Sequence, residues 1–142
     1  MNLEVSLYLF VAIICWGFGA IFDKLTLRYF DPVSAFYSRT FIIIVFFSIF
    51  VSTRFLKTIN DLKIASKSGL IYISLSVIVA MVGVFAYLKA MSFSEASRIV
   101  PISSTYPLVT FIIAVLFLGE SFTLTKLIGT IFVILGVYFI SK

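Results

Sequence analysis

Four consecutive hydroxyl side chains and two prolines interrupt an apolar run in the second half of the chain. The run is RIVPISSTYPLVTFIIAVLFLGE, residues 98–120, and the hydroxyls occupy positions 103–106. Pro107 has no amide hydrogen for the carbonyl of Ser103, so we predict a bend there, whereas Pro101 is predicted in the first turn, where proline is tolerated. Freed backbone inside a bilayer needs hydroxyls, neighbouring helices or water as partners. A substrate-binding break and a plain proline kink are both open interpretations.

Three further apolar runs carry stripes of small or polar residues at helical spacing. Such residues let helices approach closely or hydrogen-bond across a helix contact. For the stripes within residues 34–52 and 72–87, packing against other helices and lining of a cavity are both open interpretations. For the stripe within residues 129–136 we favour a contact between helices or between two copies of the chain. The stripes are Ser34, Ser38, Phe41, Val45, Ser48 and Ser52; Tyr72, Ser76, Ala80, Gly83 and Tyr87; and Gly129, Phe132 and Gly136.

Charged residues near the apolar runs are costly to bury in lipid, so their positions are informative. Lys24 closes the first run, with Asp23 beside it to offset its charge, and Arg39 lies about two turns inside the second run. Anchoring at the membrane interface and contact with a substrate are both open for Lys24 and Arg39. For Glu95 and Glu120 we expect roles in loops or helix caps.

The residue inventory argues against several other kinds of chemistry. The chain has no histidine and a single cysteine, Cys15, in an apolar run, and its carboxylates are spread over different loops. No acid/base or nucleophile pair is at useful spacing, so we expect no enzyme, no metal site and no cofactor. The net charge of +5 comes from residues in short loops between apolar runs, which suits a lipid surface better than nucleic acid.

Composition defines the elements that must position these residues. The chain has 142 residues, of which 62% are hydrophobic and 12% charged, the balance of an integral membrane protein. About 20 apolar residues cross a bilayer core of about 30 Å. We expect an all-α membrane protein, a single domain over residues 1–142 with no cleavable signal peptide and the termini on opposite sides. Its five predicted spans are about 4–22, 33–52, 69–88, 98–118 and 123–140.

Two finer features follow from this arrangement. Asp31 and Pro32 are predicted to start the second helix, as the capping residue and the first helical residue. The eleven Lys and Arg residues divide almost evenly between the two faces, which predicts insertion in both orientations unless the dense loop at 53–68 decides alone. One face holds Arg54, Lys57, Lys63, Lys67 and Lys126, and the other holds Lys24, Arg28, Arg39, Lys89, Arg98 and Lys142.

Two long stretches together resemble a known family. WGFGAIFDKLTLRYFDPVSAFYSR is similar to the opening of an EamA domain of the drug/metabolite transporter superfamily, and SEASRIVPISSTYPLVTFIIAVLFLGESFTLTKLIGTIFVILGVYFI to its closing half. The match covers nearly the whole chain. Most members carry two such domains with ten spans, the halves inverted, whereas this sequence holds one. The related small multidrug resistance proteins pair as dimers and use a carboxylate eight residues before a lysine, where this chain has Trp16.

The resemblance implies a multi-pass transporter of the cell membrane, the inner one where the envelope has two. We expect a homodimer, antiparallel or parallel, that moves small metabolites or amphipathic drugs outward by alternating access, and the missing carboxylate leaves the coupling ion open. The alternative is an accessory or assembly subunit of another membrane complex. Gly129 and Gly136 are the expected contact residues. The expected substrate residues are Trp16, Arg39, Tyr72, Ser76, Tyr87, Ser103, Ser104, Tyr106 and Pro107.

Overall fold

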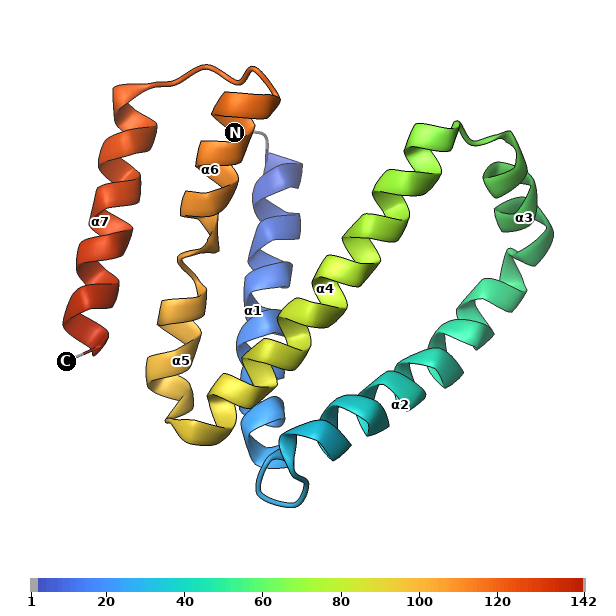
Figure 1. The fold of residues 1–142 in the computed structure, drawn as a ribbon, viewed down its shortest axis with the longest axis horizontal. Coiled ribbons are helices and arrows are strands. Elements are labelled where there is room, and N and C mark those ends of the chain that lie inside the picture. Colours follow the sequence, from blue (N-terminus) through green and yellow to red (C-terminus); the bar gives the residue numbers. More distant parts are fainter. Residues whose placement is uncertain (1–2, 142) are drawn as a thin grey trace. The chain divides into compact units, whose positions relative to one another are not determined.

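The structure, a computed structural model, describes residues 3–141, and this part of the chain is almost entirely helical (Figure 1). Four stretches are long and apolar enough to cross a membrane: Leu3–Thr26, Pro32–Thr53, Lys67–Phe93 and Ala96–Phe117. The prediction of an all-helical membrane protein is confirmed. The helices are α1 (Leu3–Thr26), α2 (Pro32–Thr53), α3 (Phe55–Ile64), α4 (Lys67–Phe93), α5 (Ala96–Ser103), α6 (Tyr106–Phe117) and α7 (Leu124–Ser141).

The last helix, α7, has 18 residues and is shorter than the four candidate spans. At about 1.5 Å per residue it is about 27 Å long, close to the thickness of a bilayer core. A fifth span therefore remains a prediction, and so do the sides on which the termini emerge.

A short helix, α3, occupies most of the connection that was predicted over residues 53–68. It is separated from α2 by Arg54 alone and from α4 by Ala65 and Ser66. The pattern FLKTINDLKI places apolar residues at helical spacing, which indicates an amphipathic helix. The prediction of a loop over the whole connection was therefore wrong.

Asp31 and Pro32 start α2, as predicted. The Asp31 carboxylate accepts hydrogen bonds from the amides of Val33, at 2.9 Å, and Ser34, at 3.1 Å, and Pro32 occupies the first turn. The cap satisfies two of the amides that lack partners at the start of a helix. Hydrogen bonds from the Ser34 hydroxyl and then from the Ser34 and Val33 amides hold the pKa of Asp31 below its ordinary 3.8.

The predicted fourth span is broken into α5 and α6 at Ser104 and Thr105, drawn as a thin connection in Figure 1. The prediction of an interruption beside Pro107 is confirmed, but the expected place of Pro101 in a first turn was wrong. Pro101 lies inside α5, which begins at Ala96, and Pro107 lies in the first turn of α6. The chain stops one helix before Pro107 and starts the next at Tyr106, where a missing amide hydrogen breaks no helical bond.

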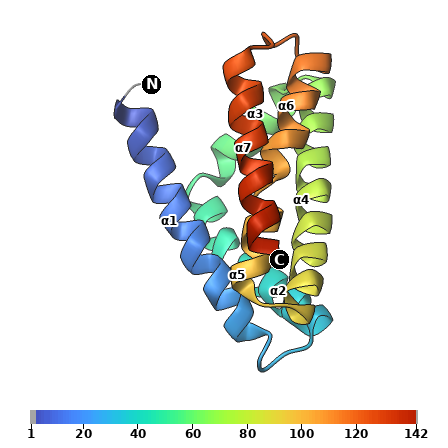
Figure 2. The same ribbon diagram turned by 90° about the vertical axis from the view of Figure 1, so that its left-hand side faces the viewer.

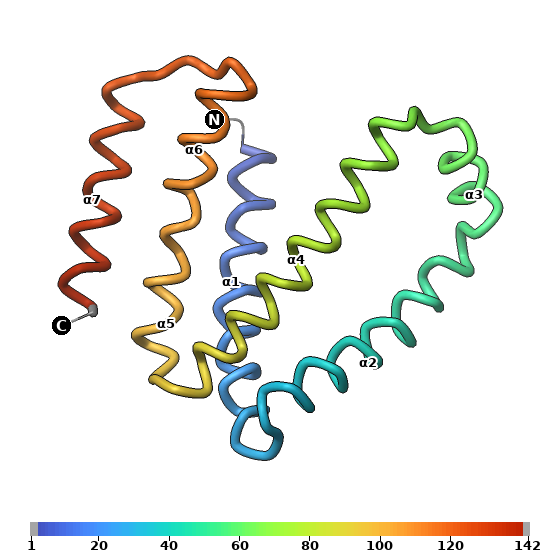
Figure 3. The backbone as a smooth tube through the Cα atoms, in the orientation of Figure 1, coloured from blue at the N-terminus to red at the C-terminus, as the bar shows by residue number. Residues whose placement is uncertain are grey.

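The chain divides into two compact units, Met1–Ile21 with Phe93–Lys142, and Phe22–Ser92. We call the first the broken-helix unit; it contains most of α1 together with α5, α6 and α7. We call the second the hairpin unit; it contains the end of α1 together with α2, α3 and nearly all of α4. In the broken-helix unit, α7 packs against α5, as Figure 2 shows. In the hairpin unit, the trace in Figure 3 runs along α2, turns through α3 and returns along α4.

Few side chains are buried. In the hairpin unit, Leu88 is 1% and Met91 0% exposed, and the rings of Phe36 in α2 and Phe85 in α4 meet edge to face with centroids 5.4 Å apart. Most large apolar side chains are exposed, which is expected where lipid rather than protein covers them. The buried residues among those described are Ala20, Ala35, Leu88, Met91 and Ala114.

Candidate functional site

The break between α5 and α6 carries the hydroxyl run that the sequence singled out. The hydroxyls of Ser103 and Ser104 each donate to the Val100 carbonyl at 2.8 Å, and that of Thr105 donates to the Ile102 carbonyl at 2.7 Å. These bonds return to the last turns of α5 itself. The hydroxyl hydrogens therefore reinforce the end of α5, while the oxygens keep lone pairs that can accept from another group.

The surface around this break is exposed in its own unit. Ser103, Ser104 and Pro107 are exposed, and the Tyr106 side chain is 59% exposed. The break thus presents hydroxyl groups, one aromatic ring and the N-terminus of α6, whose dipole is positive. A small molecule with an aromatic surface and hydrogen-bonding groups could bind such a combination.

Arg39 in α2 pairs with Asp23 near the end of α1. A guanidinium nitrogen of Arg39 lies 2.5 Å from a carboxylate oxygen of Asp23, and the side chains are 42% and 18% exposed. The sequence predicted that Asp23 offsets the charge of Lys24, whereas in the structure Asp23 has Arg39 as an ion-pair partner.

Lys24 lies beside Asp23 and reaches a third helix. Its ammonium group donates to the Met91 carbonyl at 2.7 Å, and Met91 lies in the last turn of α4. The final carbonyls of a helix have no partner within that helix, and a lysine there also suits the negative end of the helix dipole. Lys24 therefore caps α4, and local sequence patterns carry no sign of this contact because the two residues are 67 positions apart.

The nine expected substrate residues fall into two sets. The broken-helix unit holds Trp16, which is 67% exposed, with Ser103, Ser104, Tyr106 and Pro107. The hairpin unit holds Arg39, Tyr72, Ser76 and Tyr87.

We call Asp23, Lys24 and Arg39 the charged cluster. Only part of the expected substrate residues of the hairpin unit lies near it. Tyr87 lies within electrostatic range of Asp23 and Arg39. Tyr72 lies about four turns earlier in α4, where its side chain is 71% exposed. The Ser76 hydroxyl donates to the Ile73 carbonyl of its own helix at 2.8 Å.

The acidic residues around α5 and α6 have local roles. Glu95 precedes α5 as its capping residue without a side-chain cap bond, and Glu120 pairs with Lys126 at 3.6 Å. Gly119 has φ of +66°, a conformation that favours glycine, and allows the Glu120 amide to donate to the Ala114 carbonyl at 3.2 Å. The loop role expected for Glu120 is consistent with this geometry.

The glycine seam of α7 is open in the described chain. A methyl group added at Gly129 or Gly136 would meet no described atom within 4 Å outside the neighbouring backbone of its own helix. Nor do three or more His, Cys, Asp or Glu side chains gather as a metal site among residues 3–141. Aromatic rings, hydroxyls and paired charges are what this chain offers a ligand.

A helical chain with several apolar spans, one of them broken beside hydroxyl groups, has the features of a membrane transporter. The chain matches the EamA-like transporter family over residues 4–142. It therefore belongs to that family, as the sequence motifs indicated.

Two curated relatives are similar to this chain. An uncharacterized protein of Methanocaldococcus jannaschii is 27% identical over 141 residues, covering 99% of this chain and 98% of the relative. An uncharacterized transporter of Archaeoglobus fulgidus is 28% identical over 138 residues, covering 97% of this chain and 48% of the relative. The chain thus spans about half the length of the second relative. No solved structure matches the chain.

Proposed function

We propose that the protein is a secondary transporter that exports small metabolites or amphipathic drugs as a homodimer, by alternating access. The single observation that carries the proposal is the α5–α6 break, with Ser103, Ser104 and Tyr106 exposed beside it. Secondary transporters bind substrate near the midplane with discontinuous helices of this kind. The family assignment supports the same function.

The substrate class follows from the side chains near the break. Tyr106 and Trp16 offer aromatic surface, and the serine oxygens accept hydrogen bonds, which favours a small molecule with an aromatic or apolar body and a few donors. Arg39 is already paired with Asp23. In our proposal Arg39 contacts substrate only if the substrate competes for that pair.

Pairing of two copies is supported by the relatives. The match covers 98% of one relative and 48% of another, so a stretch similar to this chain forms nearly all of one protein and about half of another. Two copies would supply the two repeats between which an alternating-access path lies. The exposed Gly129 and Gly136 are the contact we propose.

The proposed topology has five spans, with the termini on opposite sides of the cell membrane. An even distribution of Lys and Arg would let the chain insert in both orientations and form an antiparallel pair. To test this, Cys15 is replaced by alanine and Asn60 in α3 by cysteine, and intact cells are labelled with an impermeant thiol reagent. Labelling of about half the protein supports dual insertion, whereas all or none indicates a single orientation, with a parallel dimer or a different partner.

Transport itself is tested with purified protein in liposomes. Ethidium, an amphipathic aromatic dye, and radiolabelled tryptophan are the probes, with and without an imposed proton or sodium gradient. Movement of either probe above protein-free vesicles supports the proposal. A chain that moves neither under any gradient, but co-purifies in fixed ratio with another membrane protein, would favour the accessory-subunit alternative.

A further inference from the structure

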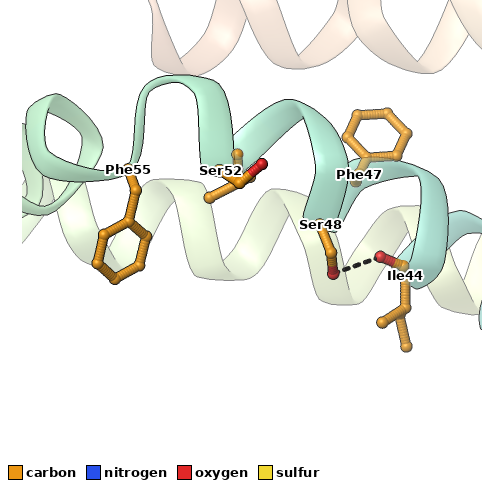
Figure 4. Close-up of a pocket in the computed structure, with 6 residues that line it drawn as sticks. Ile44, Phe47, Ser48, Ser52 and Phe55 are labelled. Atoms are coloured by element: carbon orange, nitrogen blue, oxygen red, sulfur yellow. Dashed lines mark hydrogen bonds between the residues drawn. The ribbon is translucent and has the colours of Figure 1, made fainter.

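The second half of α2 and the start of α3 form an open groove that the transport proposal does not use. The groove has a volume of about 650 Å³ and lies entirely within the hairpin unit (Figure 4). It is lined by Ile44, Phe47, Ser48, Val51, Ser52 and Phe55.

The lining of this groove favours an apolar occupant. The Ser48 hydroxyl donates to the Ile44 carbonyl at 2.7 Å, the bond drawn in Figure 4, and the Ser52 hydroxyl donates to the Ile49 carbonyl at 2.6 Å. Both hydroxyl hydrogens are therefore bonded within α2, and the rings of Phe47 and Phe55 are exposed. A hydrocarbon chain needs no hydrogen bonds and suits this surface.

The length and position of the groove match one leaflet of a bilayer. From Ile44 to Thr53, the last residue of α2, the helix rises about 14 Å, and half of a hydrocarbon core is about 15 Å. The groove thus runs from near the bilayer centre to the end of the span, the depth that one acyl chain occupies.

Basic residues gather where the groove ends. Arg54 separates α2 from α3, Lys57 and Lys63 lie in α3, and Lys67 begins α4, against one acidic residue, Asp61. All five are exposed.

The helix that carries these charges is held at the bilayer surface. Because α3 joins two spans through very short connections, it must lie near the headgroups. Phe55, Ile59 and Leu62 share one face, with Lys57 and Asp61 opposite, the pattern of a helix that lies in the membrane interface.

We propose that this groove and its basic end form a binding site for an anionic phospholipid. One acyl chain lies along the α2 groove, and the phosphate lies between Arg54 and Lys57. Opposite charge selects the headgroup, and the apolar lining holds the chain. The site is independent of the transport function and is present in each copy of the chain.

The test measures which lipid gathers at the groove of the full-length protein. Trp16 is the only tryptophan, so a Trp16→Phe, Phe55→Trp chain reports on the groove alone. It is reconstituted in bilayers with equal amounts of phosphatidylglycerol and phosphatidylcholine, and bromine is placed on the acyl chains of one lipid at a time. We expect quenching by the brominated anionic lipid to exceed that by the neutral lipid at least about twofold, a difference of about 0.4 kcal/mol.

The unmodified chain is the matched control, because its tryptophan lies in α1 at 67% exposure and should be quenched equally by both lipids. Adding Arg54→Gln and Lys57→Gln to the reporter chain should abolish the preference. Where that variant does not fold, raising the salt to about 1 M should remove most of the preference in the reporter chain itself, since the Debye length falls to about 3 Å.

Two results would overturn the proposal. Equal quenching of the groove tryptophan by both lipids would show that the headgroup is not selected. Quenching by neither lipid would show that protein, such as a second copy of the chain, covers the groove.

Discussion

The α5–α6 break and the charged residues where α1, α2 and α4 meet satisfy their polar groups in opposite ways. In the broken-helix unit, the hydroxyls of Ser103, Ser104 and Thr105 donate to carbonyls of α5 that lie three or four residues back in the chain. In the hairpin unit, Arg39 and Lys24 reach partners 16 and 67 positions away, on other helices. The first arrangement repairs a helix end locally, and the second joins separate helices.

This difference suggests which part of the molecule moves during transport and which part stays fixed. A break whose hydrogen bonds are local can bend without giving up bonds to a neighbouring helix, whereas the bonds of Arg39 and Lys24 hold the ends of α1, α2 and α4 together. In our proposal the α5–α6 break therefore moves during transport, and the charged cluster is the fixed support.

The largest expected effect comes from removing the break. Pro107→Ala gives residue 107 an amide hydrogen for the Ser103 carbonyl, which favours joining α5 and α6 into one helix. We expect transport of the liposome probes to fall about tenfold or more, because groups at the site lose their positions.

Pro101→Ala is the matched control, because Pro101 lies inside α5 and its replacement leaves the break in place. It should preserve transport and stabilise α5. Equal transport by both variants and the parent chain would show that the break is only a feature of helix geometry.

The second effect concerns the ion pair between Arg39 and Asp23. Arg39→Gln leaves Asp23, whose side chain is only 18% exposed, without its cationic partner. We expect the free energy of unfolding, measured by titration with sodium dodecyl sulfate in mild detergent, to fall by about 2 kcal/mol, between the values for exposed and buried pairs.

A double-mutant cycle with Asp23→Asn separates the pair from other effects of Arg39. If the two changes are additive, the ion pair contributes nothing and Arg39 acts elsewhere, for example on substrate. A loss of transport in Arg39→Gln at unchanged stability would also favour direct substrate contact.

A third effect distinguishes a seam between copies from packing within one copy. Gly136→Ile in α7 should weaken dimerisation by about 1 kcal/mol, measured by energy transfer between labelled copies, because close helix approach requires small residues. The protomer should keep its stability, since the structure places no described neighbour at that position.

Gly136→Ala refines this test. In a monomer it should stabilise α7 by about 0.5–1 kcal/mol through helix propensity alone. A large loss of protomer stability in Gly136→Ile, under conditions where the protein is monomeric, would place the seam inside the protomer instead.

The smallest effect concerns the start of α2 in the hairpin unit. The folded-state pKa of Asp31 is lowered, so its contribution to stability is present above its ordinary pKa of 3.8 and is lost as pH falls through the lower folded value. Asp31→Asn should therefore be less stable than the parent near pH 6, with the difference shrinking below about pH 4. A difference that stays constant over this range would show that the charge of the cap does not matter.

Local signals in the sequence predicted the local structure well. The apolar runs predicted the four long helical stretches, and Asp31 and Pro32 predicted the start of α2, because span length and helix capping depend on neighbouring residues. The hydroxyl and proline run predicted the break beside Pro107, although it misplaced Pro101, which lies inside α5. The amphipathic pattern of α3 was equally local and could have been found.

The partners of the charged side chains were not predictable in the same way. Residue order predicted Asp23 and Lys24 at the end of the first span and Arg39 about two turns inside the second, where its charge needs a partner because charge is costly in lipid. Only the tertiary structure decided that Asp23 pairs with Arg39 and that Lys24 caps α4 at Met91. Those contacts depend on which helix ends meet in space, and periodicity along a single helix carries no information about that.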